Sequence, residues 1–296
     1  MTPLPPGLHE GVPEAVYHKD PTAGVSASAS VLHTLYSQSP RHAWHAHPKL
    51  NPRWTPGKST PAQAFGRAAH AVLFGTAKVV ALDFADWKTK AAREAREMIE
   101  GQGDIALLAR QADRLERMHD TLRLGLKSHA LGDVFDEGTP ELTAIWQDDG
   151  AWLRGRLDWW REKDDLIVDY KTTEGSADPD QWSRNLFSLG SDFQSVLYRQ
   201  GVAKILGIMP RFVFIVQEVD PPHAFSVLDL DDAACEFTTN RLAHAFHTWR
   251  ECLRTKKWPG YPSQVCHVSP PVWAVKAEET RALAAAASRE IITEAV

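Results

Sequence analysis

The stretch GRLDWWREKDDLIVDYKTT, residues 155–173, contains two apolar runs joined by the charged sequence REKDD. Both runs are rich in β-branched and aromatic residues, so the stretch predicts two antiparallel strands joined by a turn. Because side chains in a strand alternate between faces, Asp169 and Lys171 should point to the same side as Ile167. Pairing through the turn would bring Asp158 of the first strand within roughly 5 Å of Asp169. These strands therefore gather two carboxylates and an ammonium group.

Two carboxylates at that separation repel each other unless a cation lies between them. Mg²⁺ is usually bound by one or two carboxylates together with water and a substrate phosphate, so the pair suits a site that cleaves phosphodiesters. There, Lys171 could orient and deprotonate the attacking water or stabilise charge on the phosphate. The spacing alone also allows a plain salt bridge, either Asp169 with Lys171 or Asp158 with Arg156.

Composition limits the class of protein. The chain has 296 residues, 43% of them hydrophobic, which is enough for a substantial core. Its net charge of -5 does not indicate a nucleic-acid partner, so DNA binding would need local clusters of Lys and Arg. Three cysteines without CxxC spacing predict reduced thiols and are too few for a four-cysteine iron–sulfur cluster. No signal sequence or membrane span is recognisable, so we expect a cytoplasmic protein.

The order of the apolar patterns predicts one α/β domain. We expect an extended N-terminal arm over residues 1–25, a single domain over 26–275, and a peripheral helix or tail over 276–296. The N-terminal half of the domain reads as helical, including the run from about 86 to 127, which is broken at GQGD. After residue 140, five short β-rich runs and two helical stretches predict a mixed sheet of about five strands flanked by helices.

Five segments, in order, carry a family resemblance: GVSASASVLHTLYSQSP, FGRAAHAVLFG, GRLDWW with IVDYKTT, DFQSVLYRQG, and WPGYPSQVCHVSPPVWA. Together they span residues 24–274 and resemble the PD-(D/E)XK nuclease superfamily, in its RecE-type branch of exonuclease VIII-like phage and prophage recombination nucleases. The resemblance implies a core like that of restriction endonucleases. The chain departs from the family at Leu157, where many relatives have a proline that lies outside the chemistry.

The resemblance also implies roles by position. His70, on a helix, would bind a metal together with Asp158, and Asp169 and the backbone carbonyl of Tyr170 would complete the coordination. Lys171 would be the catalytic lysine, acting with Asp158 and Asp169. A single histidine on a helix is otherwise more often a structural residue.

Three further residues match elements of the family around this motif. Glu141 falls where many relatives carry an acidic residue, which implies an additional catalytic group or ligand; the alternative is an exposed glutamate at a strand start. Gln194 and Tyr198, four apart on one helical face, match a Q-x-x-x-Y element that would contact the DNA backbone or support the lysine. Ordinary helix packing would explain the same pair.

Contacts to a terminal 5′ phosphate of DNA have weaker candidates. Ser28 and Arg41 flank a predicted helix start, where free N–H groups and the helix dipole favour anions. Arg67 lies one turn before the helical histidine, His70. The alternatives are simple N-capping for the serine and solubility for the arginines.

The function implied by the resemblance is a Mg²⁺-dependent exodeoxyribonuclease that degrades linear double-stranded DNA, 5′ to 3′, and leaves a 3′ single strand for an annealing recombination protein. Mn²⁺ could substitute, since both ions accept oxygen-rich sites. Processive relatives form rings, which implies a homo-oligomer. The alternatives are a structure-specific or repair endonuclease, a non-catalytic DNA-binding protein, and an unrelated α/β domain whose carboxylates only form salt bridges.

Overall fold

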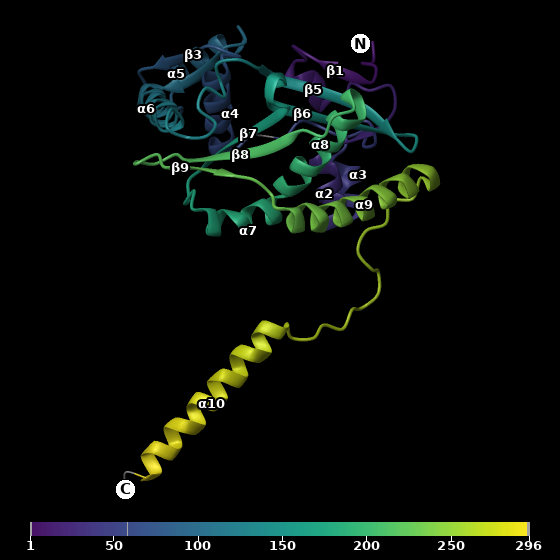
Figure 1. Ribbon diagram of the computed structural model, residues 1–296, viewed down its shortest axis with the longest axis vertical. Coiled ribbons are helices and arrows are strands. Elements are labelled where there is room, and N and C mark those ends of the chain that lie inside the picture. The colour runs from purple at the N-terminus through teal and green to yellow at the C-terminus, as the bar shows by residue number, and fades with distance from the viewer. Residues whose placement is uncertain (1, 58, 295–296) are drawn as a thin grey trace. The chain divides into compact units, whose positions relative to one another are not determined.

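The strands predicted after residue 140 form the centre of a mixed sheet (Figure 1). They are β5 (Thr139–Asp148), β6 (Ala151–Arg161), β7 (Leu166–Thr173), β8 (Arg211–Glu218) and β9 (Phe225–Leu228). Neighbours in the order β5-β6-β7 are antiparallel, β7 and β8 are parallel, and β9 is antiparallel to β8. The computed structural model describes residues 2–57 and 59–294.

The N-terminal arm is more regular than the extended chain expected for residues 1–25. It forms β1 (Gly7–His9), which pairs with β5, and a short helix, α1 (Glu14–His18). Directly after it, β2 (Ser26–Ala27) pairs in parallel with β6. The sheet therefore has seven strands instead of about five. The unpaired backbone groups at a sheet edge explain the difference, because β1 satisfies those of β5.

Helices cover both faces of the sheet (Figure 1). One face carries the larger apolar cluster, formed with α2 (Ala29–Ser37), α3 (Pro40–Ala46), α7 (Pro179–Leu189), α8 (Ser191–Leu206) and α9 (Asp232–Thr255). The other face carries a second apolar cluster, formed with α4 (Pro61–Phe74) and α6 (Ala109–Leu126). Residues of β7 alternate between these clusters: Ile167 belongs to the first, and Val168 and Tyr170 belong to the second.

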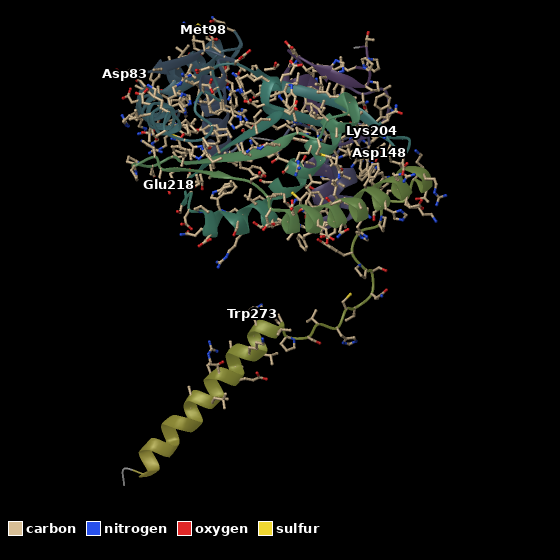
Figure 2. All side chains as sticks on the ribbon, in the orientation of Figure 1. Asp83, Met98, Asp148, Lys204, Glu218 and Trp273 are labelled. Carbon is tan, nitrogen blue, oxygen red and sulfur yellow. The ribbon has the colours of Figure 1, made fainter. Side chains whose placement is uncertain are left out.

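The region between α4 and β5 differs from the helical run predicted for residues 86–127. It contains β3 (Val79–Leu82), α5 (Lys90–Glu100) and β4 (Ile105–Leu108), and β3 and β4 form a separate two-stranded parallel sheet. Strand β4 is four apolar residues that run directly into the helix α6 (Ala109–Leu126), so it shows no periodicity that separates it from the predicted helical run, and β3 lies before that run. Asp83 and Met98, labelled in Figure 2, lie in this region, and Met98 is exposed.

Residues 260–296 form a second unit, separate from residues 1–259. It contains the helix α10 (Val272–Glu294), which begins four residues earlier than the predicted tail. Its residue Trp273 is exposed (Figure 2). None of the described helices is long and apolar enough to cross a membrane.

Candidate active site

Strands β6 and β7 separate at the two aspartates. They are joined through a single 3₁₀ turn, Glu162–Asp164, and their ladder ends at the pair Trp159 and Val168. Asp158 and Asp169 are the next residues along, just beyond the ladder. The earlier part of β6 instead pairs with β2, while β7 continues beside β8. The fork between the strands gives the aspartates room that a continuous ladder would close.

The alternation of side chains is also broken at Asp158. Leu157 and Trp160 both pack in the α8-side cluster, whereas Trp159 packs in the cluster of α4 and α6. On β5, Glu141 stands opposite this point and has a φ of 53°, a left-handed conformation that costs a non-glycine residue energy. Strained backbone of this kind is concentrated at functional sites.

Four polar contacts define the geometry at the fork. His70 on α4 places Nδ1 3.6 Å from Asp158 Oδ2. The same oxygen accepts a hydrogen bond from the backbone N–H of Tyr170 at 3.1 Å. Lys171 Nζ lies 2.6 Å from Asp169 Oδ1 and donates to Oε1 of Gln194 on α8 at 3.1 Å. Residues from α4, β6, β7 and α8 therefore meet at one place.

The charges at the fork shift each other's protonation. Burial, and then the negative charge of Asp169, raise the pKa of Asp158 to about 7, although His70 and Lys171 oppose the shift. Burial alone would lower the pKa of Lys171, but the charges of Asp169 and Asp158 outweigh it and raise that pKa. Lys171 is therefore an ammonium group at neutral pH, which suits stabilising a phosphate charge better than taking a proton from water.

The carboxylates lack the partners that buried charges usually have. Asp169 is 1% exposed, and its Oδ2 has no hydrogen-bond donor among the described residues. No group of three or more His, Cys, Asp or Glu within the described ranges could hold a metal ion by itself. The under-satisfied carboxylate of Asp169 and the nearby carboxylate of Asp158 nevertheless fit Mg²⁺, which keeps several waters and needs only one or two carboxylates plus a phosphate.

Glu141 is engaged elsewhere. Its carboxylate accepts a hydrogen bond from Arg156 Nε, and Arg156 Nη1 donates to the carbonyl of Val12 at 3.3 Å. Of the two salt bridges left open by the sequence, the pair of Asp169 with Lys171 exists, whereas Arg156 pairs with Glu141 instead of Asp158. Glu141 still contributes a negative charge that raises the pKa of Asp158, so it lies at the rim of the site.

Comparisons with known proteins identify the family and the fold of the chain. A family model described as a PDDEXK-like domain of unknown function (DUF3799) matches residues 28–269. The chain belongs to this family. The PDDEXK-like domain also resembles a candidate exonuclease from Eubacterium rectale, with 15% identity, a TM-score of 0.54, and coverage of 89% of this chain and 95% of that one. This likeness shows that the two share a fold.

A second solved structure, a phage-related exonuclease from Haemophilus somnus 129PT, is matched at 12% identity with a TM-score of 0.32, over 79% of this chain and 97% of that one. A search of curated proteins finds no match.

Gln194 and Tyr198 of the PDDEXK-like domain lie beside the fork, both on α8. Tyr198 is buried, and its ring packs so closely on β6 that a Cβ at Gly155 would lie 2.8 Å from its Cδ1. Tyr17 of α1 is hydrogen-bonded to Tyr198 and stacks against the guanidinium group of Arg154, with 5.5 Å between Cζ and the ring centroid. Sequence reasoning missed Tyr17, because it assigned this segment to an extended arm.

The candidates for the terminal phosphate are not in contact with the carboxylates among the described residues. Ser28 caps α2, where its Oγ accepts from the N–H of Val31, and it also bonds Ser30. Arg41 is exposed on α3, and Arg67 on α4 donates to Ser59 Oγ at 2.5 Å.

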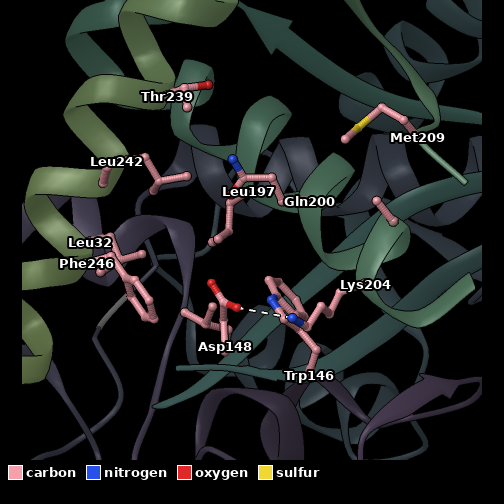
Figure 3. Close-up of a pocket in the computed structure, with 13 residues that line it drawn as sticks. Leu32, Trp146, Asp148, Leu197, Gln200, Lys204, Met209, Thr239, Leu242 and Phe246 are labelled. Atoms are coloured by element: carbon pink, nitrogen blue, oxygen red, sulfur yellow. Dashed lines mark hydrogen bonds and ion pairs between the residues drawn. The ribbon is translucent and has the colours of Figure 1, made fainter. Parts of the chain in front are cut away.

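A cavity of about 470 Å³ lies between α8 and α9 (Figure 3). Its apolar lining includes Leu197, Leu242 and Phe246, and an ion pair of 3.3 Å joins Lys204 and Asp148 there. None of the predicted site residues lines it.

Proposed function

We propose that the PDDEXK-like domain is a metal-dependent exodeoxyribonuclease acting on linear double-stranded DNA. One observation carries the proposal: the buried carboxylate of Asp169, with no hydrogen-bond donor to its Oδ2 among the described residues, lies near the half-buried carboxylate of Asp158 at the point where their strands diverge, and Lys171 Nζ is 2.6 Å from Asp169 Oδ1. Charges arranged in this way cost folding energy, so they are expected to serve a ligand that brings positive charge and a phosphate.

Asp158, Asp169, His70 and the carbonyl of Tyr170 are the groups that would hold the metal. A divalent ion bound there supplies Lewis-acid polarisation of the phosphate and a lowered pKa for water. Mg²⁺ is the expected ion, and Mn²⁺ a substitute, since both accept oxygen-rich sites. Binding of this ion would also offset the repulsion between the two carboxylates, which contributes to the raised pKa of Asp158.

The chain's own residues have distinct roles in the proposal. Lys171, held as an ammonium ion, stabilises the charge that develops on the phosphate and can donate a proton to the leaving oxygen. Gln194 accepts a hydrogen bond from its Nζ and so keeps the ammonium group aimed into the fork. Tyr198 and Tyr17 close the fork on the α8 side and restrict water there. Glu141, at the rim of the site, raises the pKa of Asp158 through its negative charge.

The finer features follow from the family resemblance. They are 5′ to 3′ degradation, release of a 3′ single strand for an annealing recombination protein, and a ring-shaped homo-oligomer. Binding of a terminal 5′ phosphate near Ser28, Arg41 and Arg67 belongs to the same proposal.

The test is degradation of linear duplex DNA labelled at one end, beside closed circular DNA, with Mg²⁺ or EDTA. Loss of the linear substrate alone, only with Mg²⁺, is the expected result, and the position of the label reports the polarity. Cutting of the circle would indicate an endonuclease instead. A folded protein that binds DNA but cleaves neither substrate would indicate a non-catalytic DNA-binding protein.

A further inference from the structure

Strand β8 carries a glutamine on the face of the sheet that is covered by α4 and α6. Side chains in a strand alternate between faces, so Gln217 points to the same side as Val213 and Ile215, which belong to the apolar cluster there. Gln217 is fully buried. A buried amide is costly unless its polar atoms are hydrogen-bonded, so the partners of Gln217 should show what it does.

Both polar atoms of the Gln217 side chain have partners. Its Oε1 accepts a hydrogen bond from the hydroxyl group of Tyr170 on β7 at 2.7 Å. Its Nε2 donates to two backbone carbonyls, that of Met118 on α6 at 2.8 Å and that of His223 at 3.1 Å, in the turn between β8 and β9. Carbonyl groups only accept, so the amide has a single orientation, with Oε1 toward the tyrosine. Gln217 therefore fixes the position of the Tyr170 hydroxyl.

The ring of Tyr170 carries this constraint to the fork. Tyr170 is fully buried, and burial raises the pKa of its hydroxyl group, which therefore stays protonated and able to donate. Its ring packs against the imidazole of His70, with 5.4 Å between the centroids and an angle of 50° between the planes. Phe74, one turn further along α4, meets the same imidazole edge-on at 5.6 Å. Two aromatic rings thus hold His70.

These ring contacts stand in for a hydrogen bond that His70 lacks. Histidines that bind metals usually donate their second ring N–H to a carboxylate or a carbonyl, which fixes the orientation of the ring. His119 shows such a contact, with Nε2 3.2 Å from the carbonyl of Ala69. Among the described residues His70 has none: its Nδ1 lies 3.6 Å from Asp158 Oδ2, beyond hydrogen-bond distance. The orientation of this imidazole therefore depends on the rings beside it.

We infer that Gln217 is a positioning residue that acts on His70 through the side chain of Tyr170. By holding the Tyr170 hydroxyl, it keeps the ring against the imidazole and the imidazole toward Asp158. The inference rests on the proposed function, in which His70 and Asp158 hold the metal, and it extends that function to the residues that orient a ligand. Gln217 itself touches neither the metal nor the DNA.

The test measures metal binding by the full chain. Tyr170→Phe removes only the hydroxyl group and keeps both the ring and the backbone carbonyl, and Gln217→Met removes the amide at similar size. Mn²⁺ is titrated without DNA, and the electron paramagnetic resonance signal of free Mn²⁺ gives the affinity. Each variant should bind Mn²⁺ about tenfold more weakly than the wild type, because the partners that orient metal ligands have effects of that size. The Mn²⁺ concentration for half-maximal cleavage of linear duplex should rise by the same factor.

A double-mutant cycle tests the path through His70. His70→Ala should weaken Mn²⁺ binding by itself. Adding Gln217→Met to His70→Ala should weaken it no further, because no imidazole is left to orient. Losses that add would mean that Gln217 acts on the site by another route, and this inference would be overturned.

The matched control is Thr238→Val on α9. It also removes a buried hydroxyl group, one that donates to Asp192 Oδ2 at 3.1 Å, but it touches neither Tyr170 nor His70 among the described residues. The control should bind Mn²⁺ like the wild type. Thermal melts establish that every variant is folded, and Tyr170→Phe is the variant least at risk, because it keeps the packing of the ring.

The outcomes separate this inference from the proposed function. If Tyr170→Phe and Gln217→Met keep the wild-type affinity for Mn²⁺ while the wild type cleaves DNA, the positioning role is overturned and the function stands. An equal loss of affinity in Thr238→Val also overturns it, since any lost buried hydrogen bond would then have the same effect. If the wild type neither binds Mn²⁺ nor cleaves DNA, both the positioning role and the proposed function fail.

Discussion

Two groups of buried charges lie along β6, and their hydrogen bonding differs. In the first, Asp20 accepts from the N–H and hydroxyl groups of Thr22 and of Ser26, at 2.7–3.3 Å. Arg154 and Lys49 lie 3.6 and 3.7 Å from the same carboxylate. In the second, at the fork, Lys171 is the one ion-pair partner of Asp169 among the residues that the structure describes.

The difference separates a structural group from a functional one. The Asp20 carboxylate has donors at both of its oxygens and joins the N-terminal arm to β6 through Arg154. The histidine beside this carboxylate, His47, is neutral at physiological pH, because burial and then the charge of Arg154 lower its pKa to about 4. The fork instead keeps a buried carboxylate, that of Asp169, whose Oδ2 has no donor among the described residues. Whether a buried carboxylate has enough hydrogen-bond donors is therefore a better guide to its role than its burial alone.

The largest effect should come from the lysine at the fork. Lys171→Ala should lower the rate of linear DNA cleavage by about 10³-fold or more, equivalent to about 4 kcal/mol, because the developing phosphate charge loses its ammonium partner. The measurement is single-turnover cleavage of end-labelled duplex. The control is Lys204→Ala, which removes a lysine in the last turn of α8 and should cleave like the wild type. Full activity in Lys171→Ala would show that the fork is not the active site.

The second prediction compares the two clusters directly through isosteric changes. Asp20→Asn should lower the free energy of unfolding by about 3 kcal/mol, because it leaves the buried guanidinium group of Arg154 uncompensated. Asp169→Asn should change it by less than about 1 kcal/mol while abolishing cleavage. Urea denaturation followed by circular dichroism measures both. Equal losses of stability would remove the distinction between the clusters.

The third prediction concerns the pH dependence of stability without metal. The pKa of Asp158 is raised from 3.8 to about 7 in the folded chain, so the folded state binds a proton more tightly than the unfolded state does. The stability from this proton is complete below about pH 4 and is lost as the pH rises through about 7. In EDTA, Asp158→Asn should therefore be more stable than the wild type by about 2 kcal/mol at pH 8.

Denaturation of both proteins across the pH range tests this prediction. The advantage of Asp158→Asn should shrink toward zero near pH 4. A stability difference between the two proteins that does not vary with pH would contradict the prediction, because it would mean that folding does not raise the pKa of Asp158.

The smallest effect should come from Gln194, which positions Lys171 through one hydrogen bond. Gln194→Ala should lower kcat by about tenfold, or about 1.4 kcal/mol, with KM nearly unchanged. Gln194→Glu keeps an acceptor for the ammonium group and should recover part of the activity. A rise in KM alone would assign Gln194 to DNA binding instead.

The strands and the motif were predictable from the sequence, because the signals are local. The alternation in LIVDYKTT identified the shared face of Asp169 and Lys171, and the turn REKDD predicted antiparallel pairing with the strand of Asp158. The family resemblance, now supported by the match over residues 28–269, placed His70 near Asp158 before any contact between helix and strand was known.

Other features were decided only by the tertiary structure, because they depend on partners that are distant in the chain. Arg156 pairs with Glu141 and not with Asp158, at the point where the alternation of β6 breaks and Glu141 on β5 has a φ of 53°. The arm became β1 and α1, because the edge of β5 and the arginines of β6 offered it partners. Local sequence reports propensity and periodicity, but which charges are satisfied is settled only when separate segments pack together, and that decides the difference between Asp20 and Asp169.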